Sequence, residues 1–220
     1  MKGDDPMKVI VIGANGQIGQ QVVKELQKSD THSVTAMVRN VEQAEKLIAE
    51  NIQVIVADLE GTVEDLAKAI TGADSIIFIA GSGGKTGPDK TLLIDLDGAV
   101  KTMEAAKKIG VERYVMVSAF DADKRQNWNE GMRPYYVAKH YADRMLEASG
   151  LNYTIVRPGG LVNEPAIGKI TVGTEAKPST ITREDVAHTL IATLENEKTY
   201  LRSFNLVNGE QSIEIALNKL

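Results

Sequence analysis

A glycine-rich segment near the start of the chain constrains the fold more than any other feature of the sequence. Gly13, Gly16 and Gly19 directly follow the apolar residues 9–12 and precede a segment with helical periodicity. A buried strand, a tight glycine turn and a helix N-terminus form an anion site, because backbone N–H groups and the positive end of the helix macrodipole converge there. The glycines also allow the backbone to approach a pyrophosphate closely. This context, with the spacing G-x-x-G-x-x-G, predicts a dinucleotide site.

The remaining sequence alternates apolar runs with amphipathic segments. We expect strands at residues 8–12, 33–38, 53–57, 75–80, 113–118 and 153–157. We expect helices at residues 17–28, 41–50, 63–70, 91–109 and 135–149. Most of the expected strands are apolar throughout, as parallel strands are when helices cover both faces of a sheet. Repeated strand–helix units need right-handed crossovers, so the pattern predicts an α/β fold with a doubly wound, mostly parallel sheet.

Polar caps and glycines mark the ends of several expected helices. Asn40, Thr62 and Thr182 stand at N-cap positions, where a side-chain oxygen can accept a hydrogen bond from the first helical turn. Gly110 and Gly150 stand where a helix would end in a left-handed residue. These residues support the expected helix boundaries.

The alternation weakens after residue 157, where Pro158 opens an irregular stretch. Beyond it we expect a strand at 169–172, a helix at 183–194 and a core strand at 203–207, with 210–220 ambiguous. This small C-terminal region can form the substrate side of a cleft but is too short for an independent substrate domain. Because no linker or repeat is evident, residues 7–220 are predicted to form a single domain, preceded by an extension at residues 1–6.

Composition and charge exclude several classes of function. The chain of 220 residues has a formal net charge of −5, so no excess of Lys and Arg could neutralise the phosphates of a nucleic acid. It contains no cysteine, which excludes disulfides, thiolate metal sites and thiol nucleophiles. Its histidines lack metal-ligand spacing, and no metal site is expected. No apolar stretch approaches the ~20 residues that span a bilayer and no signal-peptide pattern occurs, so the sequence predicts a cytoplasmic protein without a membrane partner.

The residue after the second expected strand indicates the cofactor. Sites selective for NAD usually carry Asp or Glu there for the ribose hydroxyls, but this chain has Arg39. A guanidinium matches a 2′-phosphate in charge and in its forked donors, so the sequence favours NADP over NAD. A solvated loop charge is the alternative interpretation of Arg39.

Two further segments at the same edge of the expected sheet could contact the cofactor. Asp58, after the third strand, could accept a hydrogen bond from the adenine amino group or could be a turn aspartate. Residues 81–84 follow the fourth strand at the carboxyl edge, where ligands bind in such folds. Their glycines could let the nicotinamide lie close to the backbone, although a flexible loop would have the same composition.

Tyr135 and Lys139 are candidates for acid–base chemistry. Their spacing of four residues puts both side chains on one face of a helix. A lysine ammonium beside a phenol stabilises the phenolate and lowers the pKa of the tyrosine from its usual value of about 10. Such a tyrosine can exchange a proton with a carbonyl or alcohol oxygen during hydride transfer, and the hydroxyl of Ser118, which ends the fifth expected strand, could hold that oxygen. The alternative is a half-buried tyrosine beside a surface lysine.

Together these motifs resemble those of the short-chain dehydrogenases/reductases, in the atypical branch that is similar to NAD-dependent epimerases/dehydratases. The segments that carry the resemblance are the glycine turn, residues 58–59, 80–84, 95–98 and 117–118, the Tyr135/Lys139 pair and residues 157–160. It covers residue 7 to about residue 208 and implies a Rossmann-type fold. It implies that Ser118, Tyr135 and Lys139 form the catalytic set, with Asp95 where most members have Asn. It implies cofactor contacts from Gly13, Asn15, Gly16, Gln17, Ile18, Gly19, Arg39, Asp58, Leu59, Ala80, Gly81, Lys139 and Pro158.

The aspartate at position 95 has a physical consequence. An amide both donates and accepts hydrogen bonds, whereas an ionised carboxylate only accepts them. We therefore expect Asp95 to pair with Lys139 and to weaken the effect of that ammonium on the pKa of Tyr135.

The expected function is that of an NADP-dependent oxidoreductase, which transfers a hydride to or from a small carbonyl, quinone or flavin-like substrate. A non-catalytic NADP(H)-binding redox sensor is the alternative, which a weakened relay at Asp95 would suit. A nucleotide-sugar epimerase or dehydratase is disfavoured, because such enzymes bind their large substrate with a C-terminal domain. The polar segment 121–133, which holds Trp128, must pass near the cleft as a mobile lid or as a plain surface loop.

Overall fold

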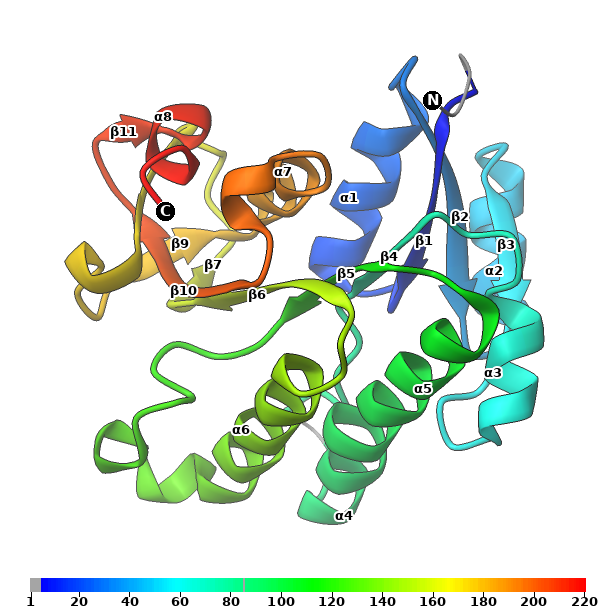
Figure 1. The fold of residues 1–220 in the computed structure, drawn as a ribbon, viewed down its shortest axis with the longest axis horizontal. Helices are drawn as coiled ribbons and strands as arrows, with labels where there is room; N and C mark the ends of the chain where they lie inside the picture. Colours follow the sequence, from blue (N-terminus) through cyan, green and yellow to red (C-terminus); the bar gives the residue numbers. More distant parts are fainter. Residues whose placement is uncertain (1–4, 85) are drawn as a thin grey trace.

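A central sheet organises the molecule (Figure 1). The computed structural model describes residues 5–84 and 86–220, and within these residues the sheet has the strand order β11-β8-β10-β6-β5-β4-β1-β2-β3. Its parallel strands are β1 (Met7–Ile12), β2 (His32–Val38), β3 (Gln53–Val56), β4 (Ser75–Phe78), β5 (Arg113–Val117), β6 (Asn152–Pro158) and β10 (Arg202–Asn208). β8 (Lys169–Val172) and β11 (Gln211–Ser212) extend one end of the sheet in antiparallel pairing.

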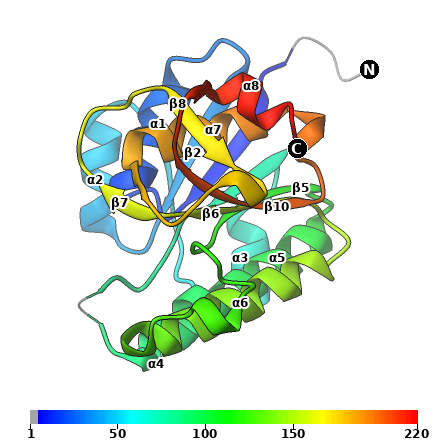
Figure 2. The same ribbon diagram turned by 90° about the vertical axis from the view of Figure 1, so that its left-hand side faces the viewer.

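Helices cover both faces of this sheet (Figures 1 and 2). One face is covered by α1 (Gln17–Gln27), α2 (Val41–Ala49), α7 (Arg183–Thr193) and α8 (Ile213–Leu217). The other face is covered by α3 (Val63–Ala69), α5 (Ala99–Ile109) and α6 (Arg133–Glu147). Within β1, Val9 and Val11 point into the core beneath α1, whereas Ile10 and Ile12 point into the core above α5. The predicted doubly wound, mostly parallel α/β fold is confirmed.

The predicted helix ends are confirmed at several positions. Three predicted N-caps each accept a hydrogen bond from the backbone N–H three residues later: Asn40, Thr62 and Thr182. Gly110 and Gly150 take the left-handed conformation just past α5 and α6, with φ of +79° and +81°. Short-range hydrogen bonding therefore sets these boundaries.

The helix predicted at residues 91–109 has a different start. It begins as the single turn α4 (Pro88–Lys90), continues as the π-helix η1 (Thr91–Gly98) and becomes α-helical only in α5. The wider π-helical turn is rare and is found mostly at functional sites. This one carries Asp95, whose side chain it turns into the protein interior.

The C-terminal part contains short elements that the sequence did not predict. β7 (Gly160–Val162) and β9 (Thr180–Thr182) form a separate parallel pair, and β11 and α8 lie in the ambiguous residues 210–220. Strands of two or three residues are too short to show a period of two in the sequence. Of the predicted extension at residues 1–6, residues 1–4 lie outside the described part of the chain. None of the helices described here has both the length and the apolar character needed to span a bilayer.

Candidate cofactor and active site

The glycine turn lies where β1 passes into α1. Gly13 has a φ of +91°, and a Cβ atom placed on it would lie 2.6 Å from the backbone nitrogen of Ala80. A Cβ atom on Gly19 would collide with the carbonyl oxygen of Gly13. In the described residues no side chain caps α1, whose N-cap is Gly16. The first backbone N–H groups of α1 therefore remain for an anion, and the turn fits the diphosphate of a dinucleotide.

Replacing Gly13 with Ala should destabilise the protein. A left-handed conformation costs a residue with a Cβ about 1–2 kcal/mol, and the clash with the Ala80 backbone adds to this cost. Thermal unfolding should therefore show a Tm at least about 3 °C lower. Gly84→Ala is the matched control, because a Cβ atom there meets nothing within 4 Å. Equal Tm values for the two variants would contradict the close approach of β1 to Ala80.

Arg39 and Asp58 lie at the same carboxyl edge, because β2 and β3 run parallel to β1. Arg39 is exposed directly after β2, and no acceptor among the described residues bonds its guanidinium. Asp58 is exposed after β3, and its Oδ1 accepts the backbone N–H of Glu60 at 2.9 Å. Asp58 thus forms a turn, as the alternative interpretation had it, while Oδ2 remains for another donor. Leu59 is buried and would contact a Cβ atom placed on Gly98 of the π-helix.

The loop after β4 joins the glycine turn to the π-helix. Ala80 lies against Gly13, and the backbone N–H of Ser82 donates to Oδ2 of Asp95 at 2.9 Å. A Cβ atom placed on Gly81 would lie 3.0 Å from Oδ1 of the same carboxylate. Asp95 therefore holds the loop for which the sequence left two interpretations open, a contact with the nicotinamide or a flexible loop.

Asp95 also pairs with Lys139, as the sequence predicts. Oδ1 of Asp95 lies 3.2 Å from Nζ of Lys139, and the two side chains are 2% and 5% exposed. Lys139 Nζ also donates to the carbonyl oxygen of Val117 at 3.3 Å and lies 5.7 Å from the centroid of the Tyr135 ring. The structure thus brings Asp95, Lys139 and Tyr135 together beside the loop that follows β4.

The electrostatics of this cluster differ in part from the sequence-based expectation. Burial raises the pKa of the Tyr135 phenol above its usual range. Lys139 acts in the opposite direction, as predicted, but Asp95 adds to the upward shift and the pKa of Tyr135 remains raised. For Lys139, burial favours the neutral form, but Tyr135 and Asp95 outweigh it and the pKa of the ammonium is raised. The cluster therefore holds a protonated phenol beside a charged lysine.

Ser118 takes a position that its predicted role did not suggest. Its side chain is buried, with 2% exposure, and lies against the carboxylate of Asp143 on α6 without a hydrogen bond of good geometry. Burial raises the pKa of Asp143 above its usual range, although Arg157 and the Ser118 hydroxyl act in the opposite direction. Its contact with a substrate oxygen stays a prediction, which requires the hydroxyl to become accessible.

Asp143 and Arg157 form a buried ion pair that sequence reasoning missed. Nε of Arg157 lies 2.9 Å from Oδ2 of Asp143. Asp143 follows Lys139 by four residues, so Tyr135, Lys139 and Asp143 share one stripe of α6. This spacing was the available signal. Pro158, directly after Arg157, ends β6, and its carbonyl oxygen accepts the backbone N–H of Phe120 at 3.1 Å.

The segment 121–133 is packed against α6. The Trp128 ring stacks on Tyr136 at 5.8 Å between centroids and meets His140 edge-on at 5.5 Å. At the base of the segment, Asn205 Nδ2 donates to Oδ1 of the buried Asp121 at 2.6 Å. These contacts at the start and in the middle of the segment favour a fixed wall beside α6 over a mobile lid.

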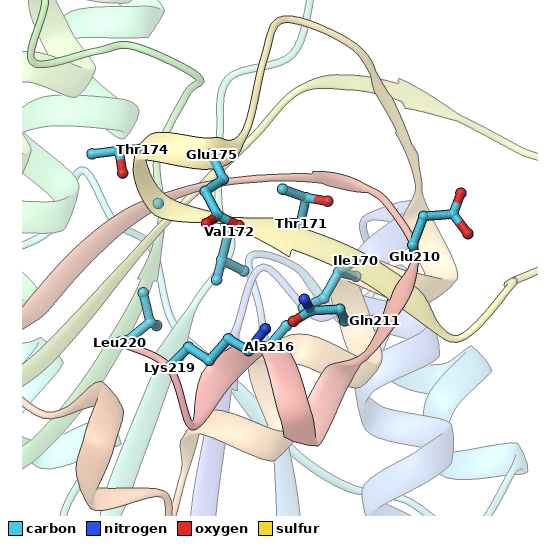
Figure 3. Close-up of a pocket in the computed structure, with 11 residues that line it drawn as sticks. Ile170, Thr171, Val172, Thr174, Glu175, Glu210, Gln211, Ala216, Lys219 and Leu220 are labelled. Carbon is cyan, nitrogen blue, oxygen red and sulfur yellow. The ribbon is translucent and has the colours of Figure 1, made fainter.

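Two cavities in the described part of the molecule differ in how near they lie to the glycine turn. One, of about 220 Å³, is enclosed by β8, the segment after it, β11 and α8 (Figure 3). It belongs to the antiparallel end of the sheet, several strands away from β1 and β4. The other, of about 520 Å³, includes Gln17 at the start of α1 and therefore adjoins the glycine turn.

Comparison with known proteins agrees with this geometry. The model of the family described as NAD(P)H-binding matches residues 13–197. The Bacillus subtilis protein YhfK, named an uncharacterized sugar epimerase, is 54% identical over 97% of this chain and 100% of its own length. A solved structure from Bacillus halodurans, provisionally named an NAD-dependent epimerase/dehydratase, has a TM-score of 0.91 at 40% identity and covers 97% of this chain and 100% of its own.

The Lactococcus lactis oxidoreductase ylbE is similar as well. Its structure has a TM-score of 0.88 at 33% identity and covers 97% of this chain and 96% of its own. The chain therefore belongs to the NAD(P)H-binding family of Rossmann-fold proteins, among the atypical short-chain dehydrogenases/reductases related to NAD-dependent epimerases and dehydratases.

Proposed function

We propose that this protein is an NADP-dependent oxidoreductase that reduces a small carbonyl, quinone or flavin-like substrate. The observation that carries the proposal is the cluster of Tyr135, Lys139 and Asp95 beside the glycine turn. In it, a phenol, an ammonium and a carboxylate adjoin the loop that Asp95 holds through Ser82. A buried lysine beside a tyrosine is costly, and few functions other than acid–base catalysis would explain this pair at the carboxyl edge of the sheet, where ligands bind in such folds.

The residues of the cluster have separate roles in the proposed reaction. When bound, NADPH supplies the hydride for the substrate carbon. The Tyr135 phenol donates its proton to the substrate oxygen, and the raised pKa of Tyr135 keeps the phenol protonated for this step. Lys139 stabilises the phenolate that remains, and Asp95 orients Lys139 and holds the loop at Ser82. A protonated tyrosine favours the direction of reduction at neutral pH.

The size of the C-terminal region supports a small substrate. After β6 the chain forms three-residue strands, α7, one core strand and the antiparallel end of the sheet. These elements complete the main sheet and do not form a second domain that could enclose a nucleotide sugar. Although a relative carries the name of a sugar epimerase, we therefore place reduction ahead of epimerisation.

Arg39 should determine the preference for NADP. Its guanidinium is exposed at the end of β2, where the 2′-phosphate of the adenosine would lie. The Arg39→Gln variant should bind NADPH about tenfold or more weakly, because a charge-assisted bidentate contact is lost, and should bind NADH as the wild type does. Calorimetric titration of the wild type and of Arg39→Gln with both nucleotides measures this. An equal loss for NADH and NADPH would contradict the assignment.

Consumption of NADPH tests the activity. The wild-type protein should oxidise NADPH in the presence of at least one acceptor from a panel of aldehydes, quinones and flavins. Tight binding of NADPH without turnover on any acceptor would favour the redox sensor. The ion pair between Asp95 and Lys139 is compatible with that function, because it weakens the effect of the ammonium on Tyr135. If calorimetry detects no binding of either nucleotide at millimolar concentration, both functions are wrong.

A further inference from the structure

The start of α1 and the start of α7 share a cavity. This space of about 520 Å³ is bounded by α1, by the segment after β7 and by the first residues of α7. α7 packs beside α1 on the same face of the sheet (Figure 1). Because Gln17 is the first residue of α1, the cavity opens beside the uncapped N-terminus that would receive the diphosphate.

The glycine turn brings no cation to the diphosphate. Residues 13–19 contain no Lys or Arg, so only backbone N–H groups and the helix dipole would meet two negative charges. Two cationic side chains, Lys24 and Arg183, line the shared cavity. Lys24 lies about two turns further along α1, with Nζ 4.0 Å from Oε2 of Glu50. Arg183 is the cation that the fold adds from a distant part of the sequence.

The guanidinium of Arg183 is oriented but mostly unused. Nη1 donates to Oδ1 of Asn163 at 2.8 Å, and among the described residues this oxygen is the one hydrogen-bond acceptor of the guanidinium. A guanidinium has five N–H donors in a planar fork, which suits phosphate oxygens. The side chain is half-buried, so it is less screened by water than a surface arginine would be.

The start of α7, which carries Arg183, holds the segment after β7 in place on the other side of the cavity. Oε2 of Glu184 accepts the backbone N–H of Ala166 at 2.9 Å, and Oδ1 of Asp185 accepts that of Gly168 at 2.8 Å. Glu184 also lines the cavity, but among the described residues its carboxylate forms no ion pair with Arg183 and accepts the backbone N–H of Ala166 instead. Glu164, which also lines the cavity, is exposed to solvent.

We propose that Arg183, oriented by Asn163, is a cofactor-binding residue that contacts the diphosphate from the wall of this cavity. The inference rests on the proposed function, since the diphosphate is that of NADP. It assigns the two anionic groups of the cofactor to two different arginines: Arg183 to the diphosphate and Arg39 to the 2′-phosphate.

Two fragments of the cofactor separate these roles in a calorimetric titration. ADP carries a diphosphate without the 2′-phosphate, whereas 2′-AMP carries the 2′-phosphate without a diphosphate. The Arg183→Gln variant should bind ADP about tenfold or more weakly than wild type and bind 2′-AMP equally well. Arg202→Gln, a change of an exposed arginine at the start of β10, should leave the binding of both fragments unchanged.

A second variant keeps the inference testable if Arg183→Gln lowers the Tm. Asn163→Ala leaves the charge in place but removes the acceptor that orients it, so it should weaken ADP binding less than Arg183→Gln does. The inference is overturned if Arg183→Gln binds ADP as tightly as wild type, or loses ADP and 2′-AMP equally. If the wild type binds NADPH and only the ADP result fails, the proposed function stands and the role of Arg183 is wrong. If the wild type binds neither NADPH nor ADP, the proposed function fails.

Discussion

Replacing Tyr135 with Phe should lower kcat for reduction of a carbonyl acceptor by about 10²–10⁴-fold, because the substrate oxygen loses its proton donor. NADPH binding should change little, since in the proposed reaction the lost hydroxyl would face only the reacting end of the cofactor. The phenylalanine ring can keep the same packing beside Lys139, whose Nζ lies 5.7 Å from the centroid of the Tyr135 ring. Steady-state kinetics at saturating NADPH, together with a calorimetric Kd, measures both quantities.

Tyr136→Phe is the matched control for this variant. Tyr136 is adjacent in sequence, but its ring stacks on Trp128 and lies on a different side of α6 from the Tyr135–Lys139 stripe. Removing its hydroxyl should leave kcat within about twofold of wild type. Full turnover by Tyr135→Phe with a carbonyl acceptor would contradict the role of Tyr135 as acid. If turnover survived only with quinones or flavins, direct hydride transfer without a tyrosine acid would be indicated.

The parts of the fold that the sequence predicts are those that depend on local physics. The apolar strands, the N-caps and the glycines that end helices act within a few residues, and all are confirmed. The glycine turn is local in part, because Gly19 packs against Gly13 and Ala14 in the same strand–helix unit, whereas Gly13 meets the backbone of Ala80 after β4. Tyr135 and Lys139 are also local, because one helical turn brings them together.

The parts that the sequence does not predict depend on contacts between distant segments. The hydroxyl of Ser118 faces α6 because β5 ends against that helix, and no local pattern shows which side of the strand it takes. Trp128 is buried in part by a helix that begins several residues later, so the sequence left its segment open as lid or surface loop. Arg183 lines the same cavity as the start of α1 only because α7 packs beside α1. Contacts of this kind can be identified only once the tertiary structure is known.

Asp95 is the residue whose exchange should change the chemistry of the site most directly without removing its acid. Asp95→Asn removes a carboxylate that raises the pKa of Tyr135 and pairs with Lys139 at 3.2 Å. Two results are expected from this change. The protein should lose up to about 3–5 kcal/mol of stability, because a buried ammonium loses its partner. The pKa of Tyr135 should fall, since Lys139 then acts on the phenol with less opposition.

The pH dependence of the reaction distinguishes these two effects. Reduction needs a protonated tyrosine, so its rate falls as the pH rises through the pKa of Tyr135. In Asp95→Asn this decline should begin at a lower pH than in the wild type, whereas a loss of stability alone would lower the rate without moving the midpoint. Asp97→Asn is the matched control, because Asp97 lies on the same helix but pairs with Lys101 at the surface, at 2.9 Å. Identical pH profiles for wild type and Asp95→Asn would show that Asp95 does not control the acid, and the carboxylate would then serve only to hold the loop at Ser82.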